Sequence, residues 1–199
     1  MMRSYPPPPL SSFNRLLGGL AKINHYSQLF SLYNKMHLAG LSPDIFTLNI
    51  LVNCLCKVNR VSEALAAMVG ILRRGYIPNI VIYTTLIKGL CMEHRISEAT
   101  RLFIKMQKLG CTLDVVTYGT LIKGLCQPGI LTLLLSCIKK CSMTLVIMGL
   151  IVGREEEAKG LFEEMKAQGM IPNVISYSSL IHGFCWAGKW EESKRLFDD

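Results

Sequence analysis

A column of small polar residues recurs along this 199-residue chain at a fixed distance and brings hydrogen-bonding chemistry with it. Its members are Asn14, Asn49, Thr84 and Gly119, each 35 residues after the one before, and Ser178, which follows after a gap of 59. Amide and hydroxyl side chains both donate and accept hydrogen bonds. Most neighbouring columns hold one residue type, whereas this column varies. We therefore interpret it as a candidate for recognition of a ligand.

The elements that hold this column follow from the apolar pattern. Each copy opens with an apolar run at helical spacing, as in Leu16, Leu17 and Leu20. A polar break follows, and then a second helical run that begins with residues such as Ser97 and Glu98. The second runs end at Gly40, Gly75, Gly110 and Gly169. Glycine is a typical helix stop. The period predicts an all-α fold, an α-solenoid of stacked helix-turn-helix repeats of 35 residues that forms a right-handed superhelix.

The register of the repeat divides the chain into segments. They are an N-terminal segment 1–9, repeats 10–44, 45–79 and 80–114, a partial repeat 115–127, an irregular apolar segment 128–153, a partial repeat 154–173 and a truncated repeat 174–199. Two full repeats from position 115 would place the next first helix at position 185, whereas its apolar run opens at Val174. We interpret the eleven missing positions as a deletion or an altered reading frame.

The irregular segment is apolar but short. A pair of lysines splits it into the uncharged runs 128–138 and 141–153. Both runs fall well short of the roughly 20 residues that a helix needs to cross a bilayer, so we expect no transmembrane span.

Charge and cysteine content narrow the classes of function. The net charge of +8 and the isoelectric point of about 9.1 favour a polyanionic partner, with a solvated basic surface as the alternative. Four of the eight cysteines share one column: Cys56, Cys91, Cys126 and Cys185. A cysteine repeated at one helical position is most simply a small buried apolar residue. The remaining cysteine spacings lack the paired second half of a zinc site, so we expect no metal.

Catalytic motifs are missing from the sequence. None of the four histidines is followed by glutamate two residues later, as a zinc deaminase requires. The stretch from Gly183 to Lys189 approaches a phosphate-binding loop, but Trp190 stands where a serine or threonine would hold Mg²⁺. We therefore expect no enzyme activity, no cofactor and no small-molecule substrate.

Two phrases carry a resemblance to a known family. The first-helix phrase Val115-Val116-Thr117-Tyr118-Gly119-Thr120-Leu121-Ile122-Lys123-Gly124-Leu125-Cys126 resembles that of pentatricopeptide repeat proteins. So does the second-helix phrase Glu157-Ala158-Lys159-Gly160-Leu161-Phe162-Glu163-Glu164-Met165. The 35-residue length of the repeat is similar to that of P-class members, and the repeat sequence is similar to that of restorer-of-fertility-like plant proteins. In this chain one repeat is disrupted.

This resemblance implies an RNA-binding solenoid in mitochondria or chloroplasts that reads single-stranded RNA at one base per repeat. The expected role is processing, stability or translation of organellar transcripts, with other RNA-processing proteins as further candidate partners.

The resemblance also implies site residues. In the family, the small polar column and the last residue of the same repeat select a base together. Carried over, the pairs are Asn14 with Asp44, Asn49 with Asn79, and Thr84 with Asp114. By family rules they look like readers of U, of a pyrimidine with C preferred, and of G, in 5′ to 3′ order. Base-flanking candidates are Phe46, Val81, Val116 and Ile175, and candidate phosphate contacts are Lys22, Lys57, Lys88 and Lys123.

Three further residues are secondary candidates for base selection: Gly119, Asn173 and Ser178. Gly119 has no side chain to form a hydrogen bond, and the partner column of Asn173 falls on Met143.

Three alternatives stay open. The polar residues at the repeat boundaries could act as helix caps, alone or together with a recognition role. The array could be a peptide-binding scaffold of the tetratricopeptide type, although that repeat has about 34 residues and another signature. The chain could also be a truncated relic with little affinity for RNA.

Overall fold

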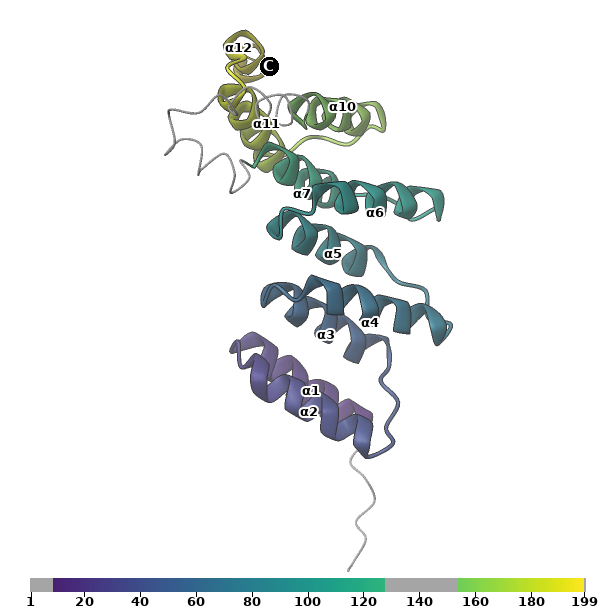
Figure 1. The fold of residues 1–199 in the computed structure, drawn as a ribbon. Helices are drawn as coiled ribbons and strands as arrows, with labels where there is room; N and C mark the ends of the chain where they lie inside the picture. The colour runs from purple at the N-terminus through teal and green to yellow at the C-terminus, as the bar shows by residue number, and fades with distance from the viewer. Residues whose placement is uncertain (1–8, 128–153, 199) are drawn as a thin grey trace, which may run out of the picture. The chain divides into compact units, whose positions relative to one another are not determined.

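The computed structural model describes residues 9–127 and 154–198, and within these ranges every regular element is a helix. The helices are α1 (Leu10–Lys22), α2 (Tyr26–Leu38), α3 (Ile45–Lys57), α4 (Val61–Arg73), α5 (Ile80–Met92), α6 (Ile96–Lys108), α7 (Val115–Cys126), α10 (Arg154–Ala167), α11 (Val174–Trp186) and α12 (Trp190–Asp198) (Figure 1). The predicted all-α fold of stacked helix-turn-helix repeats is confirmed. No helix within the described ranges has the length and apolar character that crossing a membrane requires.

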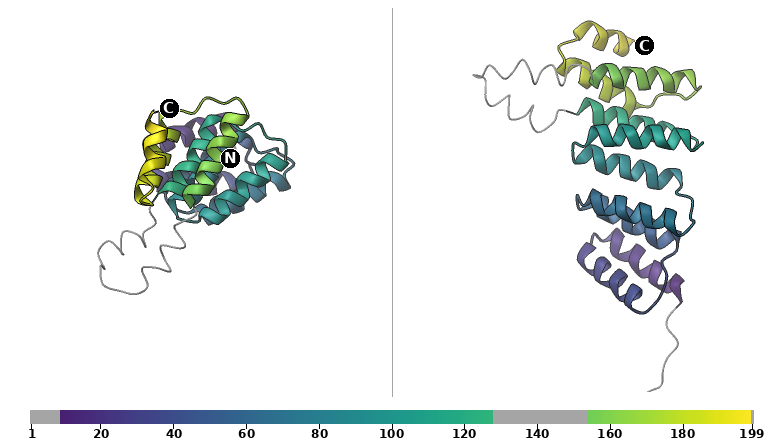
Figure 2. Two further views of the ribbon diagram at one scale, coloured as in Figure 1. Left: turned by 90° about the horizontal axis from the view of Figure 1, so that it is seen from above. Right: turned by 45° about the vertical axis from the view of Figure 1, so that its right-hand side comes forward.

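The chain divides into two compact units, Met1–Gly89 and Leu90–Asp199, with the boundary near the end of α5. In the first unit, α1 pairs with α2, α3 pairs with α4, and α1 also packs against α3. In the second unit, α7 packs against α6, α10 and α11, and α11 packs against α12. Figure 2 shows the same pairings from two further directions.

The ends of the helices follow from local chemistry. Side-chain caps begin α3, α7 and α11: the side chains of Asp44, Asp114 and Asn173 accept the amides of Thr47, Thr117 and Ser176 at 2.8, 2.8 and 3.0 Å, whereas α1 follows Pro9 and has no side-chain cap. Each cap satisfies one of the free amides at a helix start.

The second helix of a repeat ends at a left-handed glycine. Gly40, Gly75, Gly110 and Gly169 have φ of 73, 77, 71 and 75°. This conformation carries little steric penalty for glycine.

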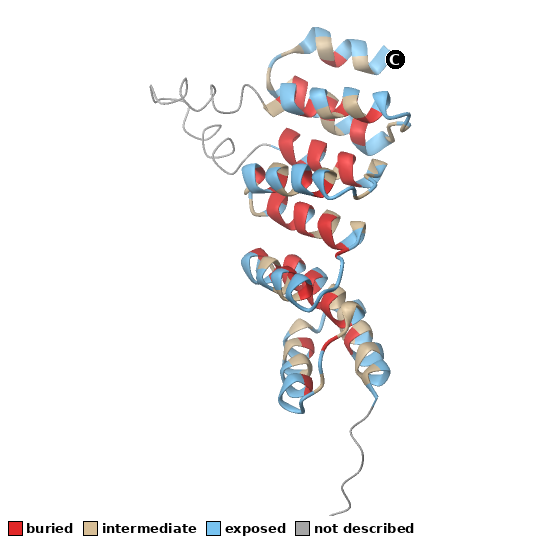
Figure 3. Cartoon of the chain, turned by 90° about the vertical axis from the view of Figure 1, so that its right-hand side faces the viewer, coloured by how far each residue is buried: buried red, intermediate tan, exposed pale blue. Residues whose placement is uncertain are grey.

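Burial concentrates on the first helices of the repeats (Figure 3). In α7 eight of the twelve residues are buried, while α1 buries only Leu17. Small residues let these helices approach closely. A Cβ built on Gly89 would lie 2.9 Å from Cys56 Sγ, one on Gly124 would lie 2.2 Å from Cys91 Sγ, and one on Gly183 would lie 2.7 Å from Cys126 Sγ.

The cysteine column acts mainly as buried apolar packing. Cys56, Cys91 and Cys126 are buried, whereas Cys185 in α11 is half-buried. Burial raises the pKa of Cys91 to about 12. Burial, together with the charge of Glu155, raises the pKa of Cys126 to about 12 as well. These two thiols therefore stay protonated at neutral pH.

Candidate functional site

The first predicted pair comes together as a polar cluster in the first unit. Asn14 projects from α1, and Asp44 caps the start of α3. Asn14 Nδ2 donates to the two carboxylate oxygens of Asp44 at 3.1 and 3.0 Å. The Thr47 hydroxyl lies 2.6 Å from Asn14 Oδ1 and 2.8 Å from Asp44 Oδ1. The cluster thus joins two neighbouring repeats through side chains 30 and 33 residues apart.

Asp44 is held as an anion. Burial alone would raise the pKa of this carboxyl, but hydrogen bonds from the Thr47 amide and hydroxyl and from Asn14 outweigh that effect. The pKa is therefore lowered from its ordinary value. Three of these hydrogen bonds end on Oδ1 and one, from Asn14, ends on Oδ2, so Oδ2 has a lone pair left to accept a hydrogen bond from a ligand N–H.

The second predicted pair leaves an acceptor without a donor. Asn79 is exposed, and its Oδ1 accepts the Ile82 amide at 3.1 Å, which caps α5. Asn49 is half-buried, and its Oδ1 is buried without a hydrogen-bond partner in the described part of the chain. An unsatisfied buried acceptor costs about 1–3 kcal/mol. Rotation of the Asn49 amide toward a bound donor would recover part of that cost.

Thr84 and Asp114 of the third predicted pair belong to different units, and each has a local role. The Thr84 hydroxyl donates to the Ile80 carbonyl at 2.8 Å within α5. Asp114 accepts the amide and the hydroxyl of Thr117 at 2.8 and 2.7 Å. Asp114 therefore repeats the geometry of Asp44 at the start of α7, and joint action of Thr84 with Asp114 stays a prediction.

The base-flanking candidates form an exposed apolar column. Phe46, Val81, Val116 and Ile175 are 68, 61, 59 and 54% exposed. Each follows the cap of a first helix by two residues. The candidate phosphate contacts Lys22, Lys57, Lys88 and Lys123 are also exposed. Exposure leaves both columns open to a ligand, and for the lysines it equally fits a solvated surface.

The capping alternative is confirmed for Asp44, Asn79, Asp114 and Asn173, because each accepts an amide of the helix it precedes. Capping does not compete with recognition here, since Asp44 caps α3 and binds Asn14 at once.

Sequence reasoning missed one column: Thr47, Thr117 and Ser176, whose hydroxyls bond to the cap. The signal was a hydroxyl residue three positions after each of these caps.

Gly119 lies opposite Asn173. A Cβ built on Gly119 would lie 3.3 Å from Ser176 Oγ and 3.9 Å from Asn173 Oδ1. Asn173 Oδ1 in turn accepts the amide and the hydroxyl of Ser176 at 3.0 and 3.2 Å. Met143, which the sequence placed in the partner column of Asn173, lies outside the described residues. Ser178 is exposed, and its hydroxyl donates to the Ile175 carbonyl at 3.3 Å.

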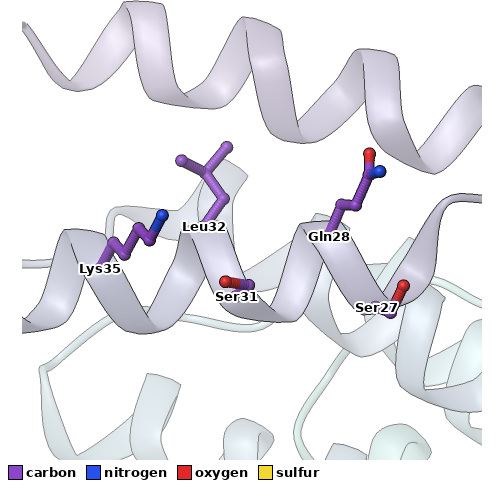
Figure 4. A pocket seen from close by; sticks show the side chains of 5 residues that line it. All are labelled: Ser27, Gln28, Ser31, Leu32 and Lys35. Atoms are coloured by element: carbon purple, nitrogen blue, oxygen red, sulfur yellow. The ribbon is translucent and has the colours of Figure 1, made fainter.

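The surface of the described residues has two open hollows. One of about 360 Å³ runs along α2 and is lined by Ser27, Gln28, Ser31, Leu32 and Lys35 (Figure 4). The other, of about 250 Å³, is lined by Lys123, Cys126, Gln127, Ser178, Ser179 and His182. The second contains the candidates Lys123 and Ser178, whereas the first contains none of the predicted residues. Across the residues that the structure describes, no group of three His, Cys, Asp or Glu side chains could hold a metal ion.

Family models match most of the chain. A model described as "PPR repeat family" matches residues 8–57 and 78–127. Two models described as "PPR repeat" match residues 168–199 in one case, and 46–76 and 142–170 in the other.

Individual relatives agree with these matches. A pentatricopeptide repeat-containing protein of Arabidopsis thaliana is 44% identical over 43 residues, which cover 22% of this chain and 9% of that protein. The crystal structure of the pentatricopeptide repeat protein PPR10 from maize is similar with a TM-score of 0.72 and 25% identity, over 98% of this chain and 24% of that one. PPR10 in complex with an 18-nucleotide psaJ RNA element gives a TM-score of 0.69 and 26% identity, over 98% and 25% of the two chains. The chain thus spans about a quarter of the maize protein.

Proposed function

Because this chain belongs to the PPR repeat family, we propose that it binds single-stranded RNA and selects one base per repeat. The observation that carries the proposal is the cluster of Asn14, Asp44 and Thr47. It places an amide and an ionised carboxylate together at the junction of two repeats, near the exposed ring of Phe46. The RNA complex of the similar maize protein supports this choice of ligand.

Apolar contacts provide affinity for the bases, and polar contacts provide selectivity among them. The exposed apolar column supplies faces for the bases, and stacking on an aromatic ring contributes about 1–3 kcal/mol per base with little sequence preference. Phe46 is the aromatic member of that column. The polar pairs supply selectivity, because amide, hydroxyl and carboxylate groups match the donors and acceptors of a base edge.

The three pairs define a short target. Asn14 with Asp44 selects U, Asn49 with Asn79 selects a pyrimidine with C preferred, and Thr84 with Asp114 selects G, from 5′ to 3′. Asn49 supports the second assignment, because its half-buried amide has an acceptor without a hydrogen bond, and the exocyclic amine of C is a donor that would satisfy this acceptor once the amide turns outward. The exposed lysine column supplies contacts to the phosphates, and the net charge of +8 attracts the RNA backbone as a whole.

We place the protein in the P-class, in the restorer-of-fertility-like plant group, with organellar transcripts of mitochondria or chloroplasts as its targets. Its role would be processing, stabilisation or translation of those transcripts, together with other RNA-processing proteins. The chain itself acts as a binding scaffold and not as an enzyme.

Fluorescence anisotropy with short RNAs tests this function. An RNA with a central U-C-G in an A-rich context should bind more tightly than RNAs in which one of the three bases is changed. Affinity should fall as salt is raised. Thr84→Asn should shift the preference at the third base from G toward U, since it recreates the combination of Asn14 and Asp44.

Lys57→Ala should weaken binding to all sequences alike. Lys108→Ala removes an exposed lysine from a second helix and is the matched control. Equal affinity for scrambled RNA would contradict base selection and favour a relic of the family. Absence of RNA binding at low salt would favour a protein-binding scaffold.

A further inference from the structure

The chain between the third repeat and the last one has an unusual length. Counted from Val115, one repeat would end at position 149 and two would end at position 184, whereas the cap of the next first helix is Asn173. The described helices in this span are α7 and α10, and these two pack against each other. Helix α10 packs against α7 as extensively as α4 packs against α3. An intact repeat consists of a first helix packed against its second helix, as α3 is packed against α4.

The same two positions of the repeat, a cysteine and a glycine, are in contact between successive first helices before and after this span. Cys56 meets Gly89 and Cys91 meets Gly124, and the two pairs have the same separation in sequence. The next contact of this kind joins Cys126 to Gly183, although the same separation would have reached only position 159. Hence α11 follows α7 in the stack as the next first helix, with twenty-four additional positions between them.

The second helices give the same result. In α6, Phe103 meets Tyr118 of α7 edge to face, with ring centroids 5.1 Å apart and an interplanar angle of 76°. In α10, Phe162 meets Tyr177 of α11 at 5.0 Å and 77°. The two pairs have the same separation in sequence. Thus α10 supports α11 as α6 supports α7.

Polar contacts tie α10 to its neighbours. Glu164 Oε1 accepts hydrogen bonds from the Tyr118 hydroxyl at 3.0 Å and from Gln107 Nε2 at 2.8 Å. The Thr100 hydroxyl donates to Glu157 at 3.2 Å. The bonds from α6 to α10 both have a sequence separation of 57, which equals that of Cys126 and Gly183. First and second helices therefore share one offset.

We propose that 115–127 and 154–173 are the two halves of a single composite repeat, with the additional positions inserted between its helices. The packing favours this reading over two partial repeats with a deletion, although a family model matches 142–170 in sequence. The composite repeat makes Gly119 and Asn173 a fourth recognition position directly after the third. This last step rests on the proposed RNA-binding function.

The geometry of the fourth position supports this assignment. Once the insertion is subtracted, Asn173 and Ser176 stand to Gly119 as Asp44 and Thr47 stand to Asn14. Both residues are close to where the Cβ of position 119 would stand. The same cluster is therefore present with one side chain missing.

The chemistry of the fourth position follows from its hydrogen bonds. Asn173 Oδ1 is occupied by Ser176, so the amide nitrogen of Asn173 is left to donate to the base. Every base edge carries an acceptor, and this position should bind a base with little selectivity.

A double-mutant cycle in the full chain tests the composite repeat without RNA. Tyr118→Phe and Glu164→Gln should each lower the urea midpoint, and the double variant should lower it by less than the sum of the two shifts. A second variant replaces residues 128–153 by Glu-His, the residues that stand at 93 and 94 of the third repeat, and so restores the spacing of an intact repeat. We expect it to keep its helical signal at 222 nm and its cooperative transition. Additive shifts in the cycle, or loss of folding in the shortened variant, would overturn the composite repeat.

RNA binding tests the fourth position. Gly119→Asn recreates the combination of Asn49 and Asn79, and its Cβ requires only a small movement of the Ser176 hydroxyl. It should introduce a preference of several-fold for a pyrimidine at the base immediately 3′ of U-C-G. Gly119→Ala adds the Cβ without an amide and should leave that base unselected.

The RNA-binding experiments distinguish failure of the proposed function from failure of the fourth recognition position. Loss of U-C-G selectivity in the parent chain contradicts the proposed function. Retained U-C-G selectivity, with no new preference in a folded Gly119→Asn variant or with the preference at another base, contradicts the fourth position.

Discussion

The close approach of first helices makes a sharp prediction for Gly124→Ala. The added Cβ would stand 2.2 Å from Cys91 Sγ and 2.7 Å from Cys91 Cβ. Unstrained contacts between such atoms lie at about 3.5–4.0 Å. Rotation of the thiol can relieve the first clash but not the second, because Cβ is fixed to the backbone. The two helices must therefore move apart by about 1 Å.

The expected loss is the difference between two effects. Overpacking a well-packed core costs about 1–3 kcal/mol, and a clash with a backbone-fixed atom belongs at the upper end. Replacing glycine by alanine within a helix returns about 1 kcal/mol. The net destabilisation is then about 2 kcal/mol. Gly160→Ala is the matched control in α10, where a Cβ would meet nothing within 4 Å, and it should stabilise the protein by about 0.5–1 kcal/mol.

Urea denaturation followed at 222 nm compares the two variants, with the transition midpoint as the quantity measured. The midpoint should fall for Gly124→Ala and rise for Gly160→Ala. In a Cys91→Gly background, which removes both clashing atoms, Gly124→Ala should no longer lower the midpoint. A Gly124→Ala protein as stable as the parent, or a loss that persists in the Cys91→Gly background, would refute the reasoning.

Two further predictions concern acidic side chains. Asp44→Ala should destabilise the protein by about 1 kcal/mol at pH 7 through loss of the cap. Because the pKa of Asp44 is lowered on folding, its stabilisation is present above the unfolded pKa of about 3.9 and is lost as pH falls through the folded value. Thermal melts should thus show the gap between variant and parent narrowing below about pH 4, and a gap that widens in acid would contradict the assignment. Glu155 is buried where the third repeat has Ile96, with Lys189 Nζ 3.4 Å from its carboxylate. Glu155→Ile should leave the free energy of unfolding unchanged or raise it by up to about 4 kcal/mol, so the urea midpoint should stay or rise. A clear fall of the midpoint would show that the ion pair is net stabilising.

Much of the fold could be predicted from the sequence because the determining signals are local. The apolar run from Ile80 to Met92 matches α5, and the glycines that end the second helices have the left-handed conformation expected of them. The cap residues are also visible in sequence, since an Asp or Asn before an apolar run satisfies a free amide whatever its surroundings.

The remaining features depend on contacts between distant residues. Spacing alone favoured two partial repeats between 115 and 173, because periodicity records distance along the chain and not which helices pack together. The pairing of α7 with α10 rests on contacts such as Tyr118 with Glu164, 46 residues apart. The orphaned acceptor of Asn49 also depends on what surrounds it and leaves no sequence signal.

The cysteine column places a thiol at three junctions between first helices, whereas the junction of α1 with α3 has Ala21 at this position. Cys56 and Cys91 each lie under a glycine of the following first helix, so a reagent reaches these thiols only when the junction opens, whereas Cys126 also lines the open hollow beside Lys123. Pulsed thiol labelling followed by peptide mass spectrometry would therefore yield an opening free energy for each of these junctions separately. In a linear array, where stability is a sum of local terms, such a profile ranks the junctions that carry a cysteine without any engineered probe.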